Sequence, residues 1–313
     1  MAPCSQPAAH YLAIALAAAL LLDLVYPRHS GILYLVHPVR LAYLAARKLA
    51  KPYSGVATGM VVWLVVTLSI LAPAALALCL ATPYPALWLA LSIAILKFSA
   101  SLRLLLDTVR RVASSLAEGR IDEARSTVGE IVRRPTQRLS APLVASAAIE
   151  SLAENLVDGY TSPISYYPLL GPLGPLLQRV ANTLDGAIGY RTPEYERVGK
   201  TSAHIDTLLN YIPARLTALL IALASPLAGG SLRGALRAWA RWRRSTESLN
   251  AGHPIAAMAG ALGVRLEKPG HYIINPEARP PTPSDVDRAV EIAVITATAY
   301  TLIILALVLC CST

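Results

Sequence analysis

Charged residues are scarce in this chain of 313 residues. They make up 15% of the sequence, whereas a soluble globular domain carries about 25%. Aromatic residues are also few, at 6% with a single Phe, while 55% of the residues are hydrophobic and the mean hydropathy is +0.50. The four cysteines lack the spacing of zinc ligands. These shortages exclude an ordinary soluble domain and are typical of an integral membrane protein.

The longest stretch without Asp, Glu, Lys or Arg covers residues 52–96. One membrane-spanning helix needs about 20 apolar residues, so this stretch is long enough for two. Its middle, Thr82-Pro83-Tyr84-Pro85, has the prolines of a turn. The stretch therefore predicts two spans, near 56–81 and 85–106.

Three further segments have the composition of a span. They lie near 9–26, where Asp23 interrupts the apolar run, near 207–230, where Arg215 does, and near 289–310. Residues before the first segment include no Lys or Arg, so we interpret it as a span and not as a secretory signal.

Residues 159–181 are apolar but rich in helix-breaking residues. Pro163, Pro168, Pro172 and Pro175 occur there together with Gly159, Gly171 and Gly174. Such a segment is tolerated at membrane depth only where protein or water satisfies its backbone. It either crosses as a broken helix or enters and returns, and a crossing gives six spans with both termini outside.

The predicted fold is thus all-α: a single polytopic membrane domain over residues 1–313, with five to six transmembrane helices, amphipathic cytoplasmic helices and an extramembrane loop at 233–287. The predicted location is the cell membrane, with several passes. The formal net charge is +9, and its basic residues cluster at 28–51, 103–138 and 233–244. Such clusters bind nucleic acid in some proteins, but in a membrane protein they are commoner as cytoplasmic loops, so no nucleic-acid partner is expected.

Acidic residues align in one apolar stretch, AAIESLAENLVDGYTSPISYY at 147–167. Ser140 and Pro142 predict the start of a helix over about 141–158. On that helix Glu150, Glu154 and Asp158 form one stripe, with Asn155 beside it. The stripe either faces water and pairs with arginines, or lines a functional cavity, because ionisable groups at membrane depth are costly.

The pairing of an acid with an amide recurs. Asn155-Leu-Val-Asp158-Gly159 is echoed by Asn182-Thr-Leu-Asp185-Gly186 and, reversed, by Asp206-Thr-Leu-Leu-Asn210. The glycines are consistent with two similar helix ends. An acid in a last helical turn opposes the helix dipole, however, which favours a bound cation. Both interpretations stay open; in the second, Asp158 and Asp185 hold Mg²⁺.

Basic groups accompany these acids. Arg215 lies within an otherwise uncharged run, and Lys200 and His204 precede it. Early in the chain, His37 and Arg40 stand at the start of a helical pattern. Together they suit an anionic substrate with phosphate groups, although Arg215 could also pair with a nearby acid and His37 could be structural.

Five segments of the chain occur in the order of a known family. They are HPVRL (37–41), AAIESLAENLVDGYTSPI (147–164), NTLDGAIGY (182–190), DTLLNYIPARLTALL (206–220) and NAGHPIAAMAGALGV (250–264). Over about residues 20–270 the chain resembles the CbiB/CobD family of cobalamin biosynthesis, the membrane-bound adenosylcobinamide-phosphate synthases.

The resemblance implies an ATP- and Mg²⁺-dependent ligase. It would join adenosylcobyric acid to (R)-1-amino-2-propanol or its O-phosphate through an amide bond, giving adenosylcobinamide or its phosphate. The adenosylated corrinoid is then a substrate, and membrane lipid is a partner. The resemblance leaves open association with other membrane-bound enzymes of the cobalamin nucleotide loop and with further copies of the chain.

Roles follow for the residues singled out above. Glu150, Glu154, Asp158 and Asp185 would hold metal or orient the amine, with a carboxylate or His204 as base. Supporting and phosphate- or corrin-contacting roles fall to His37, Arg40, Asn155, Asn182, Lys200, Asp206, Asn210 and Arg215. No GxxxxGK[ST] motif is present, so the nucleotide site is not marked by one.

Two other functions fit parts of the pattern. A non-catalytic membrane sensor of the AmpE-like type would have little reason to keep so many acids, amides and arginines over 147–215. A secondary transporter would use broken helices at the membrane midplane. The sequence shows no pair of matching broken spans.

Overall fold

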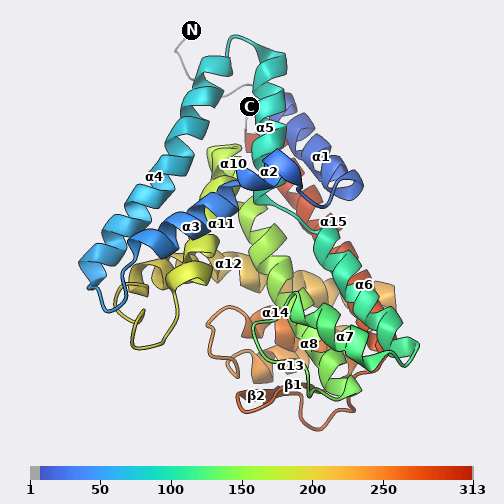
Figure 1. Cartoon of the computed structure of the whole chain (residues 1–313). Coiled ribbons are helices and arrows are strands. Elements are labelled where there is room, and N and C mark those ends of the chain that lie inside the picture. Colours follow the sequence, from blue (N-terminus) through green and yellow to red (C-terminus); the bar gives the residue numbers. More distant parts are fainter. Residues whose placement is uncertain (1–7, 312–313) are drawn as a thin grey trace. The chain divides into compact units, whose positions relative to one another are not determined.

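The computed structural model describes residues 8–311, and these are almost entirely helical (Figure 1). The one sheet among them is a hairpin of β1 (Leu266–Lys268) and β2 (Tyr272–Ile274). The predicted all-α class is confirmed.

The helices belong to two compact units that interleave along the sequence. The first comprises the chain up to Ser101, Ser162–Asn210 and the chain from Leu302; the second comprises Leu102–Thr161 and Tyr211–Thr301. Two long helices, α12 (Lys200–Ala224) and α15 (Pro283–Cys311), contribute residues to both units.

The first unit is built around three packed helices. Its helices are α1 (Ala9–Val25), α2 (Gly31–Leu35), α3 (Pro38–Leu49), α4 (Val56–Ala81), α5 (Pro85–Ser99), α9 (Ser162–Ser165), α10 (Tyr167–Leu170) and α11 (Leu173–Ile188). Ala42 and Ala46 of α3 are fully buried against Val62 of α4 and Leu184 of α11. Small residues at such contacts let helices approach closely, which is how helices associate in lipid.

The second unit contains helices that surround the acidic segment. They are α6 (Arg103–Ala117), α7 (Ile121–Gly129), α8 (Ala141–Leu156), the π-helical turn η1 (Val157–Thr161), the 3-10 turn η2 (Ser225–Ala228), α13 (Leu232–Trp242) and α14 (Gly252–Leu262). Helix α8 packs against α6, α7, α14 and β1. Its burial is nearly complete from Val144 to Ala153.

Four helices are long and apolar enough to cross a membrane. They are Val56–Ala81, Pro85–Ala117, Lys200–Ala228 and Pro283–Cys310, and the shorter apolar α1 joins them. Large apolar side chains of α4, such as Val61 and Leu68, are more than half exposed. The apolar segments of the sequence are therefore helices with the length and surface of a membrane protein.

The boundaries differ from expectation at two places. The predicted helix 85–106 is interrupted at Ala100, whose backbone is extended, so that α5 ends at Ser99 and α6 begins at Arg103. The predicted broken segment 159–181 consists of η1, α9, α10 and the first half of α11. Gly171, between α10 and α11, has a φ of 56°, a conformation that favours glycine.

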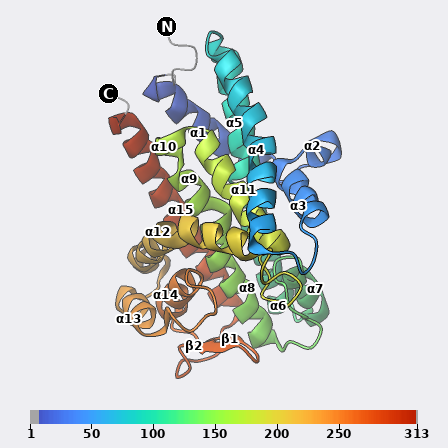
Figure 2. The same ribbon diagram turned by 90° about the vertical axis from the view of Figure 1, so that its left-hand side faces the viewer.

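The segment 233–287, predicted as an extramembrane loop, contains most of α13, all of α14 and the β-hairpin. Figure 2 shows α13 and α14 side by side. A Cβ on Gly260 would overlap the carbonyl oxygen of Gly234, and one on Gly234 would overlap that of Gly260. The two glycines let the helix backbones touch, and small residues along α14 let it be buried from end to end.

A buried ion pair explains the acid within the first predicted span. Lys97 of α5 donates to Asp23 of α1 at 2.8 Å, and both side chains are 4% exposed. Ser101 Oγ donates to the same Asp23 oxygen at 3.0 Å. Asp23 interrupts the apolar run because it ties α1 to α5.

We expect Asp23→Leu alone to destabilise the protein by about 3–5 kcal/mol, because it leaves the Lys97 charge buried without its partner. The double variant Asp23→Leu/Lys97→Met should regain most of that loss, since no charge is then stranded. Thermal unfolding of the purified protein in detergent measures both. Equal destabilisation by the single and double variants would show that the pair is not the cause.

Candidate functional site

Glu150 is the anchored member of the acidic stripe on α8. It is 4% exposed. Its carboxylate accepts from Ser146 Oγ at 2.6 Å, from Tyr272 OH at 2.8 Å and from two Arg134 nitrogens at 3.3 and 3.4 Å. Burial and the Glu150 carboxylate raise the pKa of Tyr272, which keeps its hydroxyl protonated as a donor. Glu150 therefore joins α8 to β2 and to the chain before α8.

Glu154, one turn further, has no such partner. Its side chain is exposed to solvent and makes no hydrogen bond within residues 8–311. Protein atoms nevertheless crowd the carboxyl group, and this desolvation raises the pKa of Glu154. The Glu150 charge acts in the same direction, while Lys268, Arg133 and Arg134 oppose it. Asn155 beside it donates to Ser151 O at 2.9 Å.

Asp158 does not end a helix, contrary to the helix-end interpretation of Gly159. It lies in η1, and the chain continues directly from this turn into α9. Turns with the wider π hydrogen-bonding pattern occur frequently at functional sites.

In the first unit, α11 and α12 bring three of the predicted residues together. Asp206 accepts from Asn182 Nδ2 at 3.2 Å and from Asn210 Nδ2 at 3.1 Å. Gln178 Nε2 donates to Asn210 Oδ1 at 3.0 Å, and the buried Gln178 Oε1 has no partner among residues 8–311. This amide cluster, Gln178, Asn182, Asp206 and Asn210, presents several oxygen atoms in one place.

Asp185 lies in the last turn of α11, which ends at Ile188 and not at Gly186. It stands three residues after Asn182, so both face the same side of the helix. A Cβ on Gly189 would overlap Asp185 Oδ1, so the carboxylate folds back over the helix end. Asp185 belongs to the first unit and Asp158 to the second. No group of three His, Cys, Asp or Glu able to hold a metal occurs within the described range.

His37 and Arg40 have local contacts. His37 Nδ1 accepts from Val39 N at 3.2 Å and so caps α3, and its ring packs on His29 and Phe98. Burial, helped by His29, Arg179 and Lys97, lowers the pKa of His37 to about 4. Arg40 donates to Leu35 O at 3.3 Å. His37 is therefore neutral at physiological pH.

The remaining basic residues lie on α12. Lys200 begins the helix, and His204 Nδ1 lies 2.7 Å from Lys200 O, so that Nε2 is the exposed basic nitrogen. Arg215 donates to Asn250 Oδ1 at 3.1 Å and its guanidinium lies 3.4 Å from the centre of the Tyr211 ring. Within the described residues Arg215 contacts Tyr211 and Asn250 and pairs with no acid.

Sequence reasoning missed the residues that hold the acids. Arg134, Tyr272 and Lys268 surround α8 but come from distant, unremarkable positions in the sequence, and no spacing could have indicated them. Asn250 lies in a segment that the family resemblance did single out. The second unit also has a pocket of about 310 Å³. One of its lining residues, Ser146, donates to Glu150.

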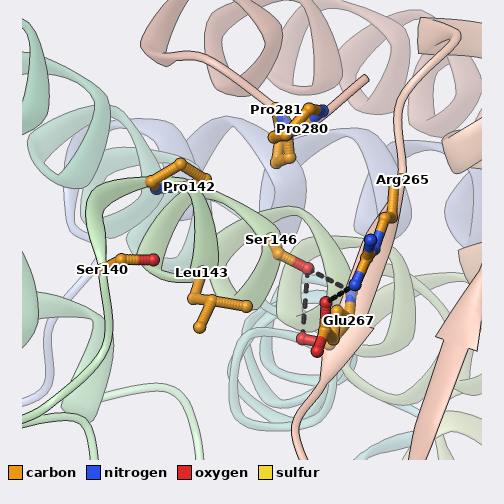
Figure 3. Close-up of a pocket in the computed structure, with 8 residues that line it drawn as sticks. All are labelled: Ser140, Pro142, Leu143, Ser146, Arg265, Glu267, Pro280 and Pro281. Atoms are coloured by element: carbon orange, nitrogen blue, oxygen red, sulfur yellow. Dashed lines mark hydrogen bonds and ion pairs between the residues drawn. The ribbon is translucent and has the colours of Figure 1, made fainter. Parts of the chain in front are cut away.

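Figure 3 shows this pocket, which is lined by Leu143 and three prolines and by Ser140, Ser146, Arg265 and Glu267. Ser146 Oγ accepts from Glu267 N at 2.7 Å while donating to Glu150. Arg265 pairs with Glu267. Because its polar groups satisfy one another, we interpret the pocket as a structural gap between α8 and the segment after α14.

Comparison with known proteins agrees with the family resemblance of the five sequence segments. A family model described as CobD/Cbib protein matches residues 16–299. The "Probable cobalamin biosynthesis protein CobD" of Aeropyrum pernix is 49% identical over 298 residues, which cover 95% of this chain and 93% of the relative. The protein of the same description from Thermoplasma volcanium is 39% identical and covers 69% and 70% of the two chains.

A third relative has the same description without the word "Probable". The "Cobalamin biosynthesis protein CobD" of Rhodobacter capsulatus is 44% identical over 200 residues, which cover 61% of this chain and 62% of that protein. No solved structure matches the chain.

Glu150→Ala should lower the free energy of unfolding by about 3–5 kcal/mol, because it leaves Arg134 buried without its carboxylate. Glu277→Ala, at an exposed acid, is the matched control and should change it by less than about 0.5 kcal/mol. Denaturant or thermal unfolding in detergent distinguishes them. A neutral result for Glu150→Ala would mean that the carboxylate does not anchor α8.

Glu154 makes stability depend on pH. Its pKa in the folded protein lies above the ordinary value of 4.5, so the folded state binds the proton more tightly and loses stability as the pH rises from there through the raised pKa. Glu154→Gln removes this loss. The unfolding temperature of the wild type should therefore fall relative to that of Glu154→Gln as pH rises, and parallel curves would contradict the raised pKa.

Proposed function

This chain belongs to the CobD/CbiB family of cobalamin biosynthesis proteins, and from that premise we propose that it is an ATP-dependent ligase. It joins the free carboxylate of adenosylcobyric acid to the amine of (R)-1-amino-2-propanol or its O-phosphate. The product is adenosylcobinamide or its phosphate. The reaction takes place at a multi-pass protein of the cell membrane.

Glu154 is the observation that supports this chemistry best. The amine must lose a proton as the amide forms, and a base works best when its pKa lies near the working pH. Desolvation moves the pKa of Glu154 upward from that of an ordinary glutamate. Glu150, in contrast, is fully occupied by Arg134, Ser146 and Tyr272. We therefore assign the base to Glu154 and a positioning role to Glu150.

The bond changes balance with Glu154 in this role. ATP converts the corrinoid carboxylate into an acyl phosphate or acyl adenylate. The amine nitrogen attacks the acyl carbon, and phosphate or AMP leaves with the electron pair of the broken C–O bond. The proton from nitrogen passes to Glu154. Arg133, Arg134 and Lys268 lie near enough to act on the Glu154 charge, and they counter the negative charge that this proton transfer leaves behind.

The amide cluster fits magnesium. Mg²⁺ is bound in proteins by one or two carboxylates together with waters and substrate phosphates, and it takes oxygen ligands. Asp206 supplies a carboxylate, and Gln178 Oε1 is a buried oxygen with no partner in the described part of the chain. Asp206 and Gln178 would hold the ion together with water, and the ion would neutralise phosphate oxygens of ATP.

Reconstitution tests the function directly. Purified protein in lipid, supplied with adenosylcobyric acid, Mg-ATP and either amine, should yield the coupled corrinoid, detected by mass spectrometry together with ADP or AMP. Comparing product formation with the phosphorylated and the unphosphorylated amine identifies which of the two is the substrate. No coupled product, under conditions in which a family member of known activity forms it, would refute the proposal.

Glu154→Gln should reduce kcat by about 10²–10⁴-fold with little change in KM, as expected for loss of a general base. The matched control is Glu277→Gln, which neutralises an exposed acid and should keep full activity. Steady-state kinetics with the amine varied provides both constants. If Glu154→Gln retained the wild-type kcat, another group, such as His204, would have to be the base.

A further inference from the structure

The segment 28–51 contains α2 and α3 and forms an exposed surface, which we call the α2–α3 surface. Figure 2 shows both helices at the edge of the first unit. None of the residues of α2 is buried. Five consecutive large apolar side chains are between 40% and 73% exposed, those of Ile32, Leu33, Tyr34, Leu35 and Val36. Such a continuous apolar patch marks a surface that contacts a partner or a membrane.

The outward face of α3 mixes apolar and basic side chains. Ala42 and Ala46 turn one face of this helix toward the core of the first unit. Leu44, Arg47 and Lys48 lie on the opposite face, and all three are exposed. A helix beside water would carry only polar residues there. Leucine next to arginine and lysine suits the boundary between lipid and water, because the long basic side chains reach the headgroups.

The charge of the α2–α3 surface has one sign. No Asp or Glu occurs between Asp23 and Asp107. Glu194, from a later loop, accepts from Tyr53 OH at 3.4 Å just beyond the segment. No basic residue of the segment forms an ion pair with a carboxylate within residues 8–311, and these residues are Arg28, Arg40, Arg47, Lys48 and Lys51. An anionic surface is the complementary partner.

Both ends of the segment continue into apolar helices. α1 ends at Val25, and α4 begins at Val56. Leu24 and Val25, at the end of α1, are 53% and 84% exposed, as lipid-facing residues are. α1 has 17 residues, and a helix of this length measures about 26 Å, less than the hydrocarbon core of about 30 Å. The chain therefore leaves α1 close to the apolar layer, and α2 follows after residues 26–30.

Tyrosines mark the same boundary. Tyr26, Tyr34, Tyr43 and Tyr53 are between 38% and 69% exposed. Tyrosine concentrates at membrane–water interfaces, because its ring is apolar and its hydroxyl group is polar. Four exposed tyrosines around α2 and α3 are therefore a second indication, independent of charge, that this surface lies against lipid.

We propose that the α2–α3 surface binds anionic phospholipid. The apolar side chains of α2 insert among the upper parts of the acyl chains, and Arg47, Lys48 and Lys51 bind the headgroup phosphates. The occupant is lipid and not a soluble phosphate, because free phosphate offers no apolar contact to α2. This surface is independent of the proposed ligase reaction, in which none of these three basic residues has a role.

Tryptophan fluorescence tests the insertion of α2. Ile32→Trp, in the full-length protein in nanodiscs, places an indole at the most exposed of the five apolar positions. Its emission, taken as the difference from the wild type, should be blue-shifted and quenched by phospholipid brominated on its acyl chains. Glu277→Trp, at an exposed acid outside the candidate spans, is the control and should show neither effect. Emission of Ile32→Trp like that of the control would overturn the proposal.

Lipid titration of the detergent-solubilised protein, followed by native mass spectrometry, tests the headgroup preference. The wild type should bind phosphatidylglycerol more tightly than phosphatidylcholine. Arg47→Gln/Lys48→Gln/Lys51→Gln should weaken the binding of phosphatidylglycerol by about tenfold or more and change that of phosphatidylcholine by less than about twofold.

The matched control for this titration is Arg110→Gln/Arg111→Gln/Arg120→Gln. It removes the same charge from three exposed arginines that already have acidic partners. It should keep the preference for phosphatidylglycerol. The proposal is refuted if the first triple variant keeps the preference as well, or if both triple variants lose it equally.

A second copy of the chain is the other occupant that these samples can detect. Light scattering measures the mass of the wild type and of Ile32→Ser/Leu35→Ser in detergent. A wild-type monomer with quenched Ile32→Trp emission supports lipid as the occupant. A wild-type dimer that this double variant dissociates, together with unquenched Ile32→Trp emission, would assign the surface to contacts between copies and overturn the proposal.

Discussion

The cost of burying an ionised side chain governs how this chain uses its few charges. A charge removed from water must be paired or hydrogen-bonded, or it destabilises the fold. Asp23 has Lys97, Glu150 has Arg134 and Tyr272, and the fully buried Asp285 accepts from Arg279 at 2.6 and 2.8 Å and from Arg288. Such compensated groups hold segments of the chain together.

The cost of removing a charge from water also matters for an acid that has no such partner. Glu154 keeps a carboxyl group with a raised pKa next to the fully bonded Glu150. Glu154 is therefore the acid to which we assigned the role of base in the proposed reaction.

Much of the fold could be read from the sequence, because lipid imposes simple rules. Long apolar runs must be helices, since a helix satisfies its own backbone, and α4 has the predicted bounds. Helix boundaries that depend on contacts with neighbouring helices could not be predicted in this way. The break at Ala100, the continuation of α8 through a π turn and the helix α14 within a Gly- and Pro-rich stretch all depend on packing that local pattern does not encode.

The sequence by itself determined the class of the protein, its family and the acids, amides and arginines that are candidates for the chemistry. Only the tertiary structure decided which of them are engaged. Glu150 and Glu154 are equivalent in sequence, one turn apart on one face, yet Tyr272 and Arg134, 122 and 16 residues away, occupy the first and not the second. Spacing along a helix fixes which residues share a face, but partners distant in sequence set their charge and availability.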